Sequence, residues 1–238
     1  MAASESQKTK PQAVDFDALE IFAGVGPATL EQIRSKAQRR AMGKGELLFN
    51  MGDAADAFYV VADGHIRIWT VSATGVEVTL NVLTAGKVFG EIGMLDGSVR
   101  TAGASAMSQT QLVSISRRSF FEALDHDPKL ARNVIELLCQ RLRWTSARME
   151  DATLRQAPQR LARILAHLAR DHGRKGPNGT EITIKLTQGE LAQWTAMSRE
   201  SLNKLINRWI DEGAIRHEKA IWTVVRLSKL EEIAEFGE

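Results

Sequence analysis

The sequence of 238 residues is long enough for two modest domains with separate hydrophobic cores. Its single cysteine, Cys139, excludes a disulfide framework and a four-cysteine zinc or iron–sulfur site within one chain. No run approaches the roughly 20 apolar residues that a membrane span needs. The net charge of +2 is uneven, because residues 153–230 contain 14 Lys and Arg against 7 Asp and Glu. This asymmetry favours a nucleic-acid-binding segment over a merely solvated basic surface.

The first residues are small and polar and lack a hydrophobic signal region. We therefore expect residues 1–14 to form a disordered leader and the protein to be cytoplasmic. Apolar residues recur at helical spacing across residues 15–40, in two groups separated by Gly24, Gly26 and Pro27. This spacing predicts short helices there.

A region of short strands is expected from about Ala41 to Ser116, where β-rich runs alternate with glycine-containing turns. The predicted strands are Glu46–Phe49, Ala57–Ala62, His65–Val71, Val76–Val82 and Gln111–Ser116. In the fourth of them apolar residues occupy every second position, the pattern of a strand with one buried face. Many short strands at regular spacing are typical of a small sandwich or barrel.

Helical periodicity returns after Ser119 and continues through a predicted helix of roughly 25 residues. One narrow stripe runs along it at steps of three and four, formed by Val134, Leu138, Leu142, Thr145, Met149 and Ala152. Such a stripe favours packing against a partner helix in a symmetric dimer; the alternative is packing against the chain's own β-domain. Pro158 ends the pattern, an amphipathic helix follows, and residues 171–180 are expected to form a loop.

Residues 186–215 have the pattern of a helix-turn-helix. Thr187 and Glu190 form a capping box that begins a short helix, in which Leu191 and Trp194 face inward. Ala196 and Met197 form the turn, and Ser198 caps a second helix. The buried face of this second helix is expected to contain Leu202, Leu205, Ile206 and Trp209.

The second helix begins with side chains that suit base edges in the major groove, namely Arg199, Glu200, Asn203 and Lys204. Those better placed for phosphates are Ser198, Ser201 and Gln188. Beyond Gly213, Ile215 and Ile221–Leu227 are predicted to form a two-stranded wing, with Arg216 and Lys219 near the DNA backbone. Three-helix cores also occur in proteins that do not bind DNA, so docking of a protein by this unit is an alternative.

The stretch Phe-Gly-Glu-Ile-Gly-Met-Leu at residues 89–95, followed by Val-Arg-Thr-Ala at residues 99–102, resembles the phosphate-binding cassette of cyclic-nucleotide-binding domains. Together with the strands and the helix-turn-helix, residues 16–227 resemble the CRP/FNR family of transcription regulators, in particular its cAMP-responsive members. Ser-Arg-Glu-Ser-Leu-Asn-Lys at residues 198–204 likewise resembles the recognition helix of that family.

The cassette residues have the chemistry that a cyclic phosphate requires. Arg100 offers a bidentate fork for the two exocyclic oxygens, Thr101 can donate to the phosphate, and backbone N–H groups near the short helix add a nest-like site. Gly90 allows close backbone approach, and Glu91 can accept the ribose 2′-hydroxyl. The resemblance adds Ile92 of the same cassette to the ligand-binding residues.

A second match lies on the long helix, where Arg-Leu-Arg-Trp-Thr-Ser at residues 141–146 resembles the adenine-binding stretch of the family. The resemblance implies that Thr145 of the same subunit and Ser146 of the partner hold the adenine, and that Arg141 is a further ligand-site arginine. The usual alternative is that both hydroxyls are indifferent surface groups.

Several departures from the family pattern affect what can be expected. Val99 stands where many cassettes have proline, which is expected to loosen the turn before Arg100. Lys204 replaces an arginine, so bidentate guanine recognition becomes a point contact. Gln156 and Pro158 occupy the hinge, so the equilibrium between hinge conformations is expected to differ from that of family members with the usual hinge residues. The cysteine cluster of the oxygen-sensing branch is absent.

The sequence therefore predicts an α+β protein with a leader (1–14), a cyclic-nucleotide-binding β-roll with flanking helices (15–128), a dimerisation helix and hinge (129–156) and a winged helix-turn-helix (157–238). We expect a cAMP-responsive homodimer, without a metal, that binds a pseudo-palindromic operator in duplex DNA and contacts RNA polymerase but no membrane. The alternatives are a response to cGMP, to a cyclic dinucleotide or to no nucleotide. A β-barrel metalloenzyme is disfavoured, because the five histidines do not cluster in the strands.

Overall fold

The computed structural model describes residues 15–72, 75, 77–154, 156–195, 197–218 and 221–237, without the side chains of 147, 148 and 150–154. The predicted leader (1–14) and the predicted positions of Val76, Ala196 and Lys219 lie outside the described residues. Two compact units are present, one of residues up to 70 with 81–139 and one of residues 71–80 with 140–238. The long helix α4 (Pro128–Leu154) contributes residues to both.

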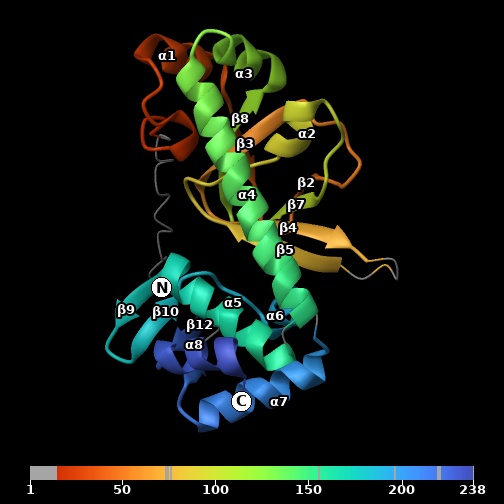
Figure 1. Ribbon diagram of the computed structural model, residues 1–238, viewed down its shortest axis with the longest axis vertical. Coiled ribbons are helices and arrows are strands. Elements are labelled where there is room, and N and C mark those ends of the chain that lie inside the picture. Colours follow the sequence, from red (N-terminus) through yellow and green to blue (C-terminus); the bar gives the residue numbers. More distant parts are fainter. Residues whose placement is uncertain are drawn as a thin grey trace, which may run out of the picture. The chain divides into compact units, whose positions relative to one another are not determined.

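The remaining helices are the 3₁₀ helix η1 (Glu20–Phe22), α1 (Pro27–Lys36), α2 (Glu91–Asp96), α3 (Arg117–Leu124), α5 (Ala157–His172), α6 (Gln188–Thr195), α7 (Arg199–Asp211) and α8 (Leu227–Phe236). Figure 1 labels the α-helices along the chain. Among the helices that the structure describes, none combines the length and the apolar character of a membrane span.

The first unit is built on two antiparallel four-stranded sheets (Figure 1). One has the order β1-β8-β3-β6 and the other β2-β7-β4-β5. Their strands are β1 (Gln38–Met42), β2 (Leu47–Phe49), β3 (Ala57–Asp63), β4 (Ile66–Val71), β5 (Glu77–Leu83), β6 (Val88–Phe89), β7 (Gly103–Ala106) and β8 (Thr110–Ser116). One core lies between the sheets and includes Val61, Leu112 and Ile66. A second core joins the other face of the first sheet to the helices through Phe58, Phe120 and other residues.

The five strands expected from alternation and turn signals are present, with ends shifted by at most one residue. Three further strands, β1, β6 and β7, were not predicted. β1 contains two adjacent arginines and four exposed positions, so its sequence has no apolar alternation. β7 is Gly-Ala-Ser-Ala, whose small residues have low strand propensity, and it is held by pairing to β2 and β4.

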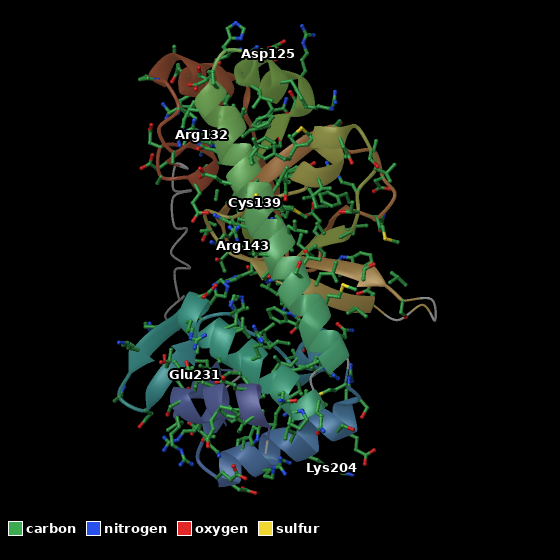
Figure 2. All side chains as sticks on the ribbon, viewed as in Figure 1. Asp125, Arg132, Cys139, Arg143, Lys204 and Glu231 are labelled. Carbon is green, nitrogen blue, oxygen red and sulfur yellow. The ribbon has the colours of Figure 1, made fainter. Side chains whose placement is uncertain are left out.

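The second unit packs α5 against α8 and carries a four-stranded sheet of order β11-β12-β10-β9 (Figure 1). Its strands are β9 (Gly173–Gly176), β10 (Gly179–Ile182), β11 (Ile215–Glu218) and β12 (Ile221–Val224). An ion pair joins Arg170 of α5 to Glu231, which Figure 2 labels on α8. Trp209 and Trp222 are fully buried, and the indole N–H of Trp222 donates to the carbonyl oxygen of Leu186 at 2.7 Å.

Two predictions in this unit were wrong. Residues 171–180 do not form a loop: most of them form the β9–β10 hairpin, because β10 pairs with β12 and the turn at Pro177-Asn178 lets the chain reverse. The predicted wing strand ended at Leu227, but the strand ends at Val224 and Leu227 begins α8. Leu230 and Ile233 bury one face of that helix.

The stripe on α4 begins one residue later than expected. Val134 is 8% exposed and belongs to the core of the first unit, so it faces the chain's own domain. Among the side chains of the helix that the structure describes, the large apolar ones that are exposed are Ile135, Leu138, Leu142 and Met149. Together with Thr145 they recur at steps of three and four, the spacing of a coiled-coil seam. A seam that the chain itself leaves uncovered is available to a partner helix.

Candidate ligand cassette and DNA-reading helix

The cassette is built where β6 ends and α2 begins. Gly90 lies at this junction in the left-handed region, with φ = 75°. A Cβ at this position would lie 2.7 Å from Nη1 of Arg100, so a larger residue would collide with the guanidinium. The glycine instead brings its carbonyl oxygen within 2.7 Å of that nitrogen, which donates a hydrogen bond to it.

Arg100 is 3% exposed, an unusual position for a cation. Its guanidinium carbon lies 4.3 Å from the ring centroid of Phe49 and 5.5 Å from that of Tyr59. Its Nη2 lies 3.9 Å from the carboxylate of Asp56, which is largely exposed. Its Nε is buried and has no hydrogen-bond partner among the described residues. Burial lowers the pKa of Arg100, and the charges of Tyr59 and Asp56 oppose that shift. The cluster is therefore a buried cation whose donors are incompletely satisfied, a site that suits an anion.

The turn before Arg100 is held from both sides by backbone hydrogen bonds. Arg100 N donates to Asp53 O at 2.8 Å, and Gly52 N donates to Arg100 O at 2.9 Å. These two hydrogen bonds fix the turn without a proline, so they oppose the loosening that was expected from Val99. Gly93, which sequence reasoning did not select, allows α2 to lie against this turn, since a Cβ there would come within 2.4 Å of Val99 O.

The other predicted ligand residues are distributed over both units. Glu91 is buried at the first position of α2, whereas Ile92 and Thr101 are exposed. Gly90, Glu91 and Arg100 are therefore brought together in the first unit. The predicted adenine-contacting residues Thr145 and Ser146 are exposed on the part of α4 that belongs to the second unit, where the further ligand-site arginine, Arg141, is half-buried. Sequence reasoning missed Phe49, Tyr59 and Asp56, because nothing local in their segments marks them as neighbours of Arg100.

The predicted helix-turn-helix is confirmed as α6 and α7. Thr187 N donates to the carboxylate of Glu190 at 2.7 Å, and Glu190 N donates to Thr187 Oγ1 at 3.2 Å, which completes the capping box. Ser201 N donates to the Oγ of Ser198, the N-cap of α7, at 3.1 Å. The four residues predicted for the inner face of α7 are all buried: Leu202, Leu205, Ile206 and Trp209.

The predicted DNA-contacting side chains lie on the outer face of this pair of helices. The exposed ones are Ser198, Arg199, Glu200, Ser201, Asn203 and Lys204, and Gln188 is half-buried at the start of α6. Figure 2 shows Lys204 on the outer side of α7. Its ammonium group lies 2.7 Å from the carboxylate of Glu200, one turn earlier. The two predicted base readers therefore form a surface ion pair in the free protein, with side chains that are 76% and 77% exposed.

The wing contains a histidine that we expect to make stability depend on pH. The ring of His217 stacks on Trp222 at 3.8 Å, its Nε2 is buried without a partner among the described residues, and burial lowers its pKa below the ordinary value of 6.5. Below about pH 6.5 the unfolded chain binds a proton that folded His217 does not, so the free energy of unfolding falls as the pH drops and levels off below the folded pKa.

Urea unfolding of the wild type and of His217→Phe between about pH 5 and pH 8 measures this effect. Phenylalanine keeps the stacked ring but cannot titrate, so the variant is expected to lose part of the pH dependence. Identical profiles for the two proteins would contradict the assignment to His217.

A β-roll with a buried arginine in a glycine-flanked cassette, joined in one chain to a helix-turn-helix, defines a ligand-binding protein that binds DNA. Within the described ranges, no three His, Cys, Asp or Glu side chains are grouped so that they could hold a metal ion.

Comparison with known proteins agrees with this class. A model of the cyclic nucleotide-binding domain matches residues 39–127, and a model of the Crp-like helix-turn-helix domain matches residues 159–233. The cyclic AMP receptor protein of Thermus thermophilus is 31% identical over 217 residues, which cover 91% of this chain and 97% of the relative.

Two solved structures extend the comparison. The catabolite activator protein of Thermus thermophilus has a TM-score of 0.52 at 30% identity, covering 92% of this chain and 100% of that one. A c-di-GMP-responsive global regulator of Xanthomonas campestris has a TM-score of 0.72 at 21% identity, covering 84% and 99%. The chain belongs to the CRP/FNR family: it is a cyclic-nucleotide-binding, DNA-binding transcription regulator and not an enzyme.

Proposed function

We propose that the protein is a cytoplasmic homodimer in which cAMP binding reorients the helix-turn-helix units toward successive major grooves of a pseudo-palindromic operator. The observation that carries the ligand part is Arg100, a buried cation with an unpartnered Nε and only a distant, exposed carboxylate near Nη2. A cyclic phosphate supplies one negative charge and two acceptor oxygens to such a fork. A relative that is 31% identical is named for cyclic AMP.

In this proposal the cassette binds the sugar and the phosphate, and α4 binds the base. Gly90, Arg100 and Thr101 lie at the phosphate, Glu91 accepts from the ribose 2′-hydroxyl, and Ile92 contributes an apolar contact. The base-contacting residues are Thr145 of the same subunit and Ser146 of the partner, and Arg141 is a further ligand-site arginine. A ligand that needs groups from two chains stabilises the arrangement in which those groups meet.

The dimer is proposed to form along the exposed seam of α4. Four large apolar side chains lie on it, and Leu142 and Met149 are 68% and 72% exposed. A monomer rarely leaves such a series of apolar residues uncovered at coiled-coil spacing. A two-fold axis along α4 would also give two reading heads related by symmetry, which requires a pseudo-palindromic operator.

For DNA reading, Arg199 and Lys204 are proposed to contact guanine, Glu200 a cytosine amino group, and Asn203 a base edge. Phosphates are contacted by Ser198, Ser201 and Gln188. RNA polymerase is the proposed partner for transcription. Moving the dimer from 1:99 to 99:1 in favour of the DNA-binding arrangement needs about 5.5 kcal/mol of differential ligand affinity. Two sites with charged and buried hydrogen bonds can supply roughly that amount.

Thr101 favours cGMP as a second candidate effector, because a threonine after the cassette arginine also suits cGMP. A cyclic dinucleotide is a third, because a structural neighbour is described as c-di-GMP-responsive. Titration calorimetry of the full chain with cAMP, cGMP and cyclic di-GMP in parallel separates them. Saturable binding of one cAMP per chain, tighter than the other two, is expected. Binding of cyclic di-GMP alone, or of none of the three, would contradict the proposed effector.

A further inference from the structure

Gly189 is the second residue of α6, and its backbone gives no reason for a glycine. It is not among the glycines with positive φ, and it lies within a regular helix. Glycine at a helical position is less favourable than alanine, because it loses more backbone freedom on folding. We therefore expect the reason for a glycine at this position to lie in the side chains that pack next to it.

What surrounds Gly189 is the side chain of Arg199, the first residue of α7. A Cβ placed on Gly189 would lie 3.1 Å from Nη2 of Arg199 and 3.5 Å from both Cζ and Nε. Three guanidinium atoms therefore lie next to the bare backbone of α6, where the Cβ of any other residue would crowd them. The two helices belong to the same compact unit.

Arg199 is otherwise unconstrained. Its guanidinium makes no hydrogen bond or ion pair with the residues that the structure describes, whereas its neighbours Glu200 and Lys204 are paired with each other. Contact with Gly189 is therefore the constraint on the direction of the fork that the described residues show. Bidentate recognition of guanine depends on that direction, because both N–H groups must meet O6 and N7 together.

We propose that Gly189 is a positioning residue that determines sequence specificity by seating the Arg199 guanidinium against α6. The proposal rests on the proposed role of Arg199 as a base reader. It predicts that a methyl group at Gly189 moves the fork by a few tenths of an ångström and weakens the recognition of one base pair. Affinity for DNA of arbitrary sequence, which depends on phosphate contacts, should not change.

The test is a double-mutant cycle on the full chain with saturating cAMP. The probes are the duplex that the wild type selects from a randomised pool and a scrambled duplex of the same composition. Arg199→Ala is expected to lower the affinity ratio between the two duplexes about tenfold. Gly189→Ala is expected to lower it about threefold, and Gly189→Leu, which fills more of the space, to lower it further. In the Arg199→Ala background, Gly189→Ala should have no effect.

Failure of the variants to fold would not imitate this result. Gly189→Ala places a better helix former in α6, so its thermal unfolding should occur at or above the wild-type temperature. An equal loss of affinity ratio in both backgrounds, or no loss in the presence of Arg199, would overturn the positioning role alone. An unchanged ratio in Arg199→Ala would overturn the base-reading role of Arg199 and the positioning role with it.

Discussion

Replacement of Arg100 by alanine is expected to weaken cAMP binding about 100-fold. The substitution removes the charged fork, and hydrogen bonds to a charged group contribute about 1.5–3 kcal/mol each. Losing one to two of them, about 1.5–6 kcal/mol, corresponds to roughly 10- to 10,000-fold in affinity, and 100-fold lies within that range. The rings of Phe49 and Tyr59, which lie beside Arg100, come from β2 and β3 and are not altered by the substitution. Titration calorimetry with cAMP measures the loss directly.

Arg118 provides the matched control for this experiment. It lies on α3 of the same unit, its side chain is 90% exposed, and its ion pair with Glu122 is on the surface. Arg118→Ala should leave cAMP affinity unchanged, and Arg100→Lys, which keeps the charge without the fork, should fall between the two. Sedimentation should show the wild-type oligomeric state in all three variants. Wild-type cAMP affinity in Arg100→Ala would contradict the assigned phosphate site.

Leu142→Asp is expected to convert the dimer into monomers and to lower operator affinity at least 100-fold. Leu142 is at the middle of the exposed α4 seam, so a two-fold dimer would bring two new carboxylates into an apolar interface. Two like charges that lose their hydration together cost several kcal/mol. This cost exceeds what Leu142 contributes to the stability of the dimer. Analytical ultracentrifugation and operator binding at fixed salt measure the two effects.

Gln140→Asp is the control for the seam. Gln140 is exposed on α4 two residues before Leu142, which places it on nearly the opposite side of the helix. The Gln140→Asp substitution adds the same aspartate side chain to the same turn of α4 but places it outside the seam. This variant should remain dimeric and bind the operator as the wild type does. A dimeric Leu142→Asp, or equal dissociation of both variants, would contradict dimerisation through this face.

The parts of the fold that were predicted correctly are those specified by nearby residues. Both helices of the helix-turn-helix follow from a cap, a turn and an apolar face within about 25 residues. The strands that were missed depend on partners that are distant in sequence: β7 is formed from small residues because β2 and β4 lie on either side of it. The β9–β10 hairpin was missed for the same reason, since its pairing with β12 is not visible in residues 171–180.

The stripe on α4 illustrates another limit. Periodicity identifies an apolar face, but Val134 and Ile135 are both apolar and adjacent, and the pattern does not say which of them the chain's own domain covers. At the cassette, the resemblance singled out Gly90, Glu91 and Arg100. The rings and the carboxylate around Arg100 come from β2, β3 and the segment before β3, so only the folded chain identifies them.

Operator affinity measured with and without cAMP, at one fixed salt concentration, tests the central claim most directly, because phosphate contacts alone vary strongly with salt. For the duplex selected by the wild-type chain, cAMP at a concentration that just saturates the wild type is expected to raise affinity at least 100-fold, and to raise it little in Arg100→Ala, which binds cAMP about 100-fold more weakly. The same operator affinity in the presence and absence of cAMP would contradict control of DNA binding by cAMP, even if the protein binds both cAMP and the duplex.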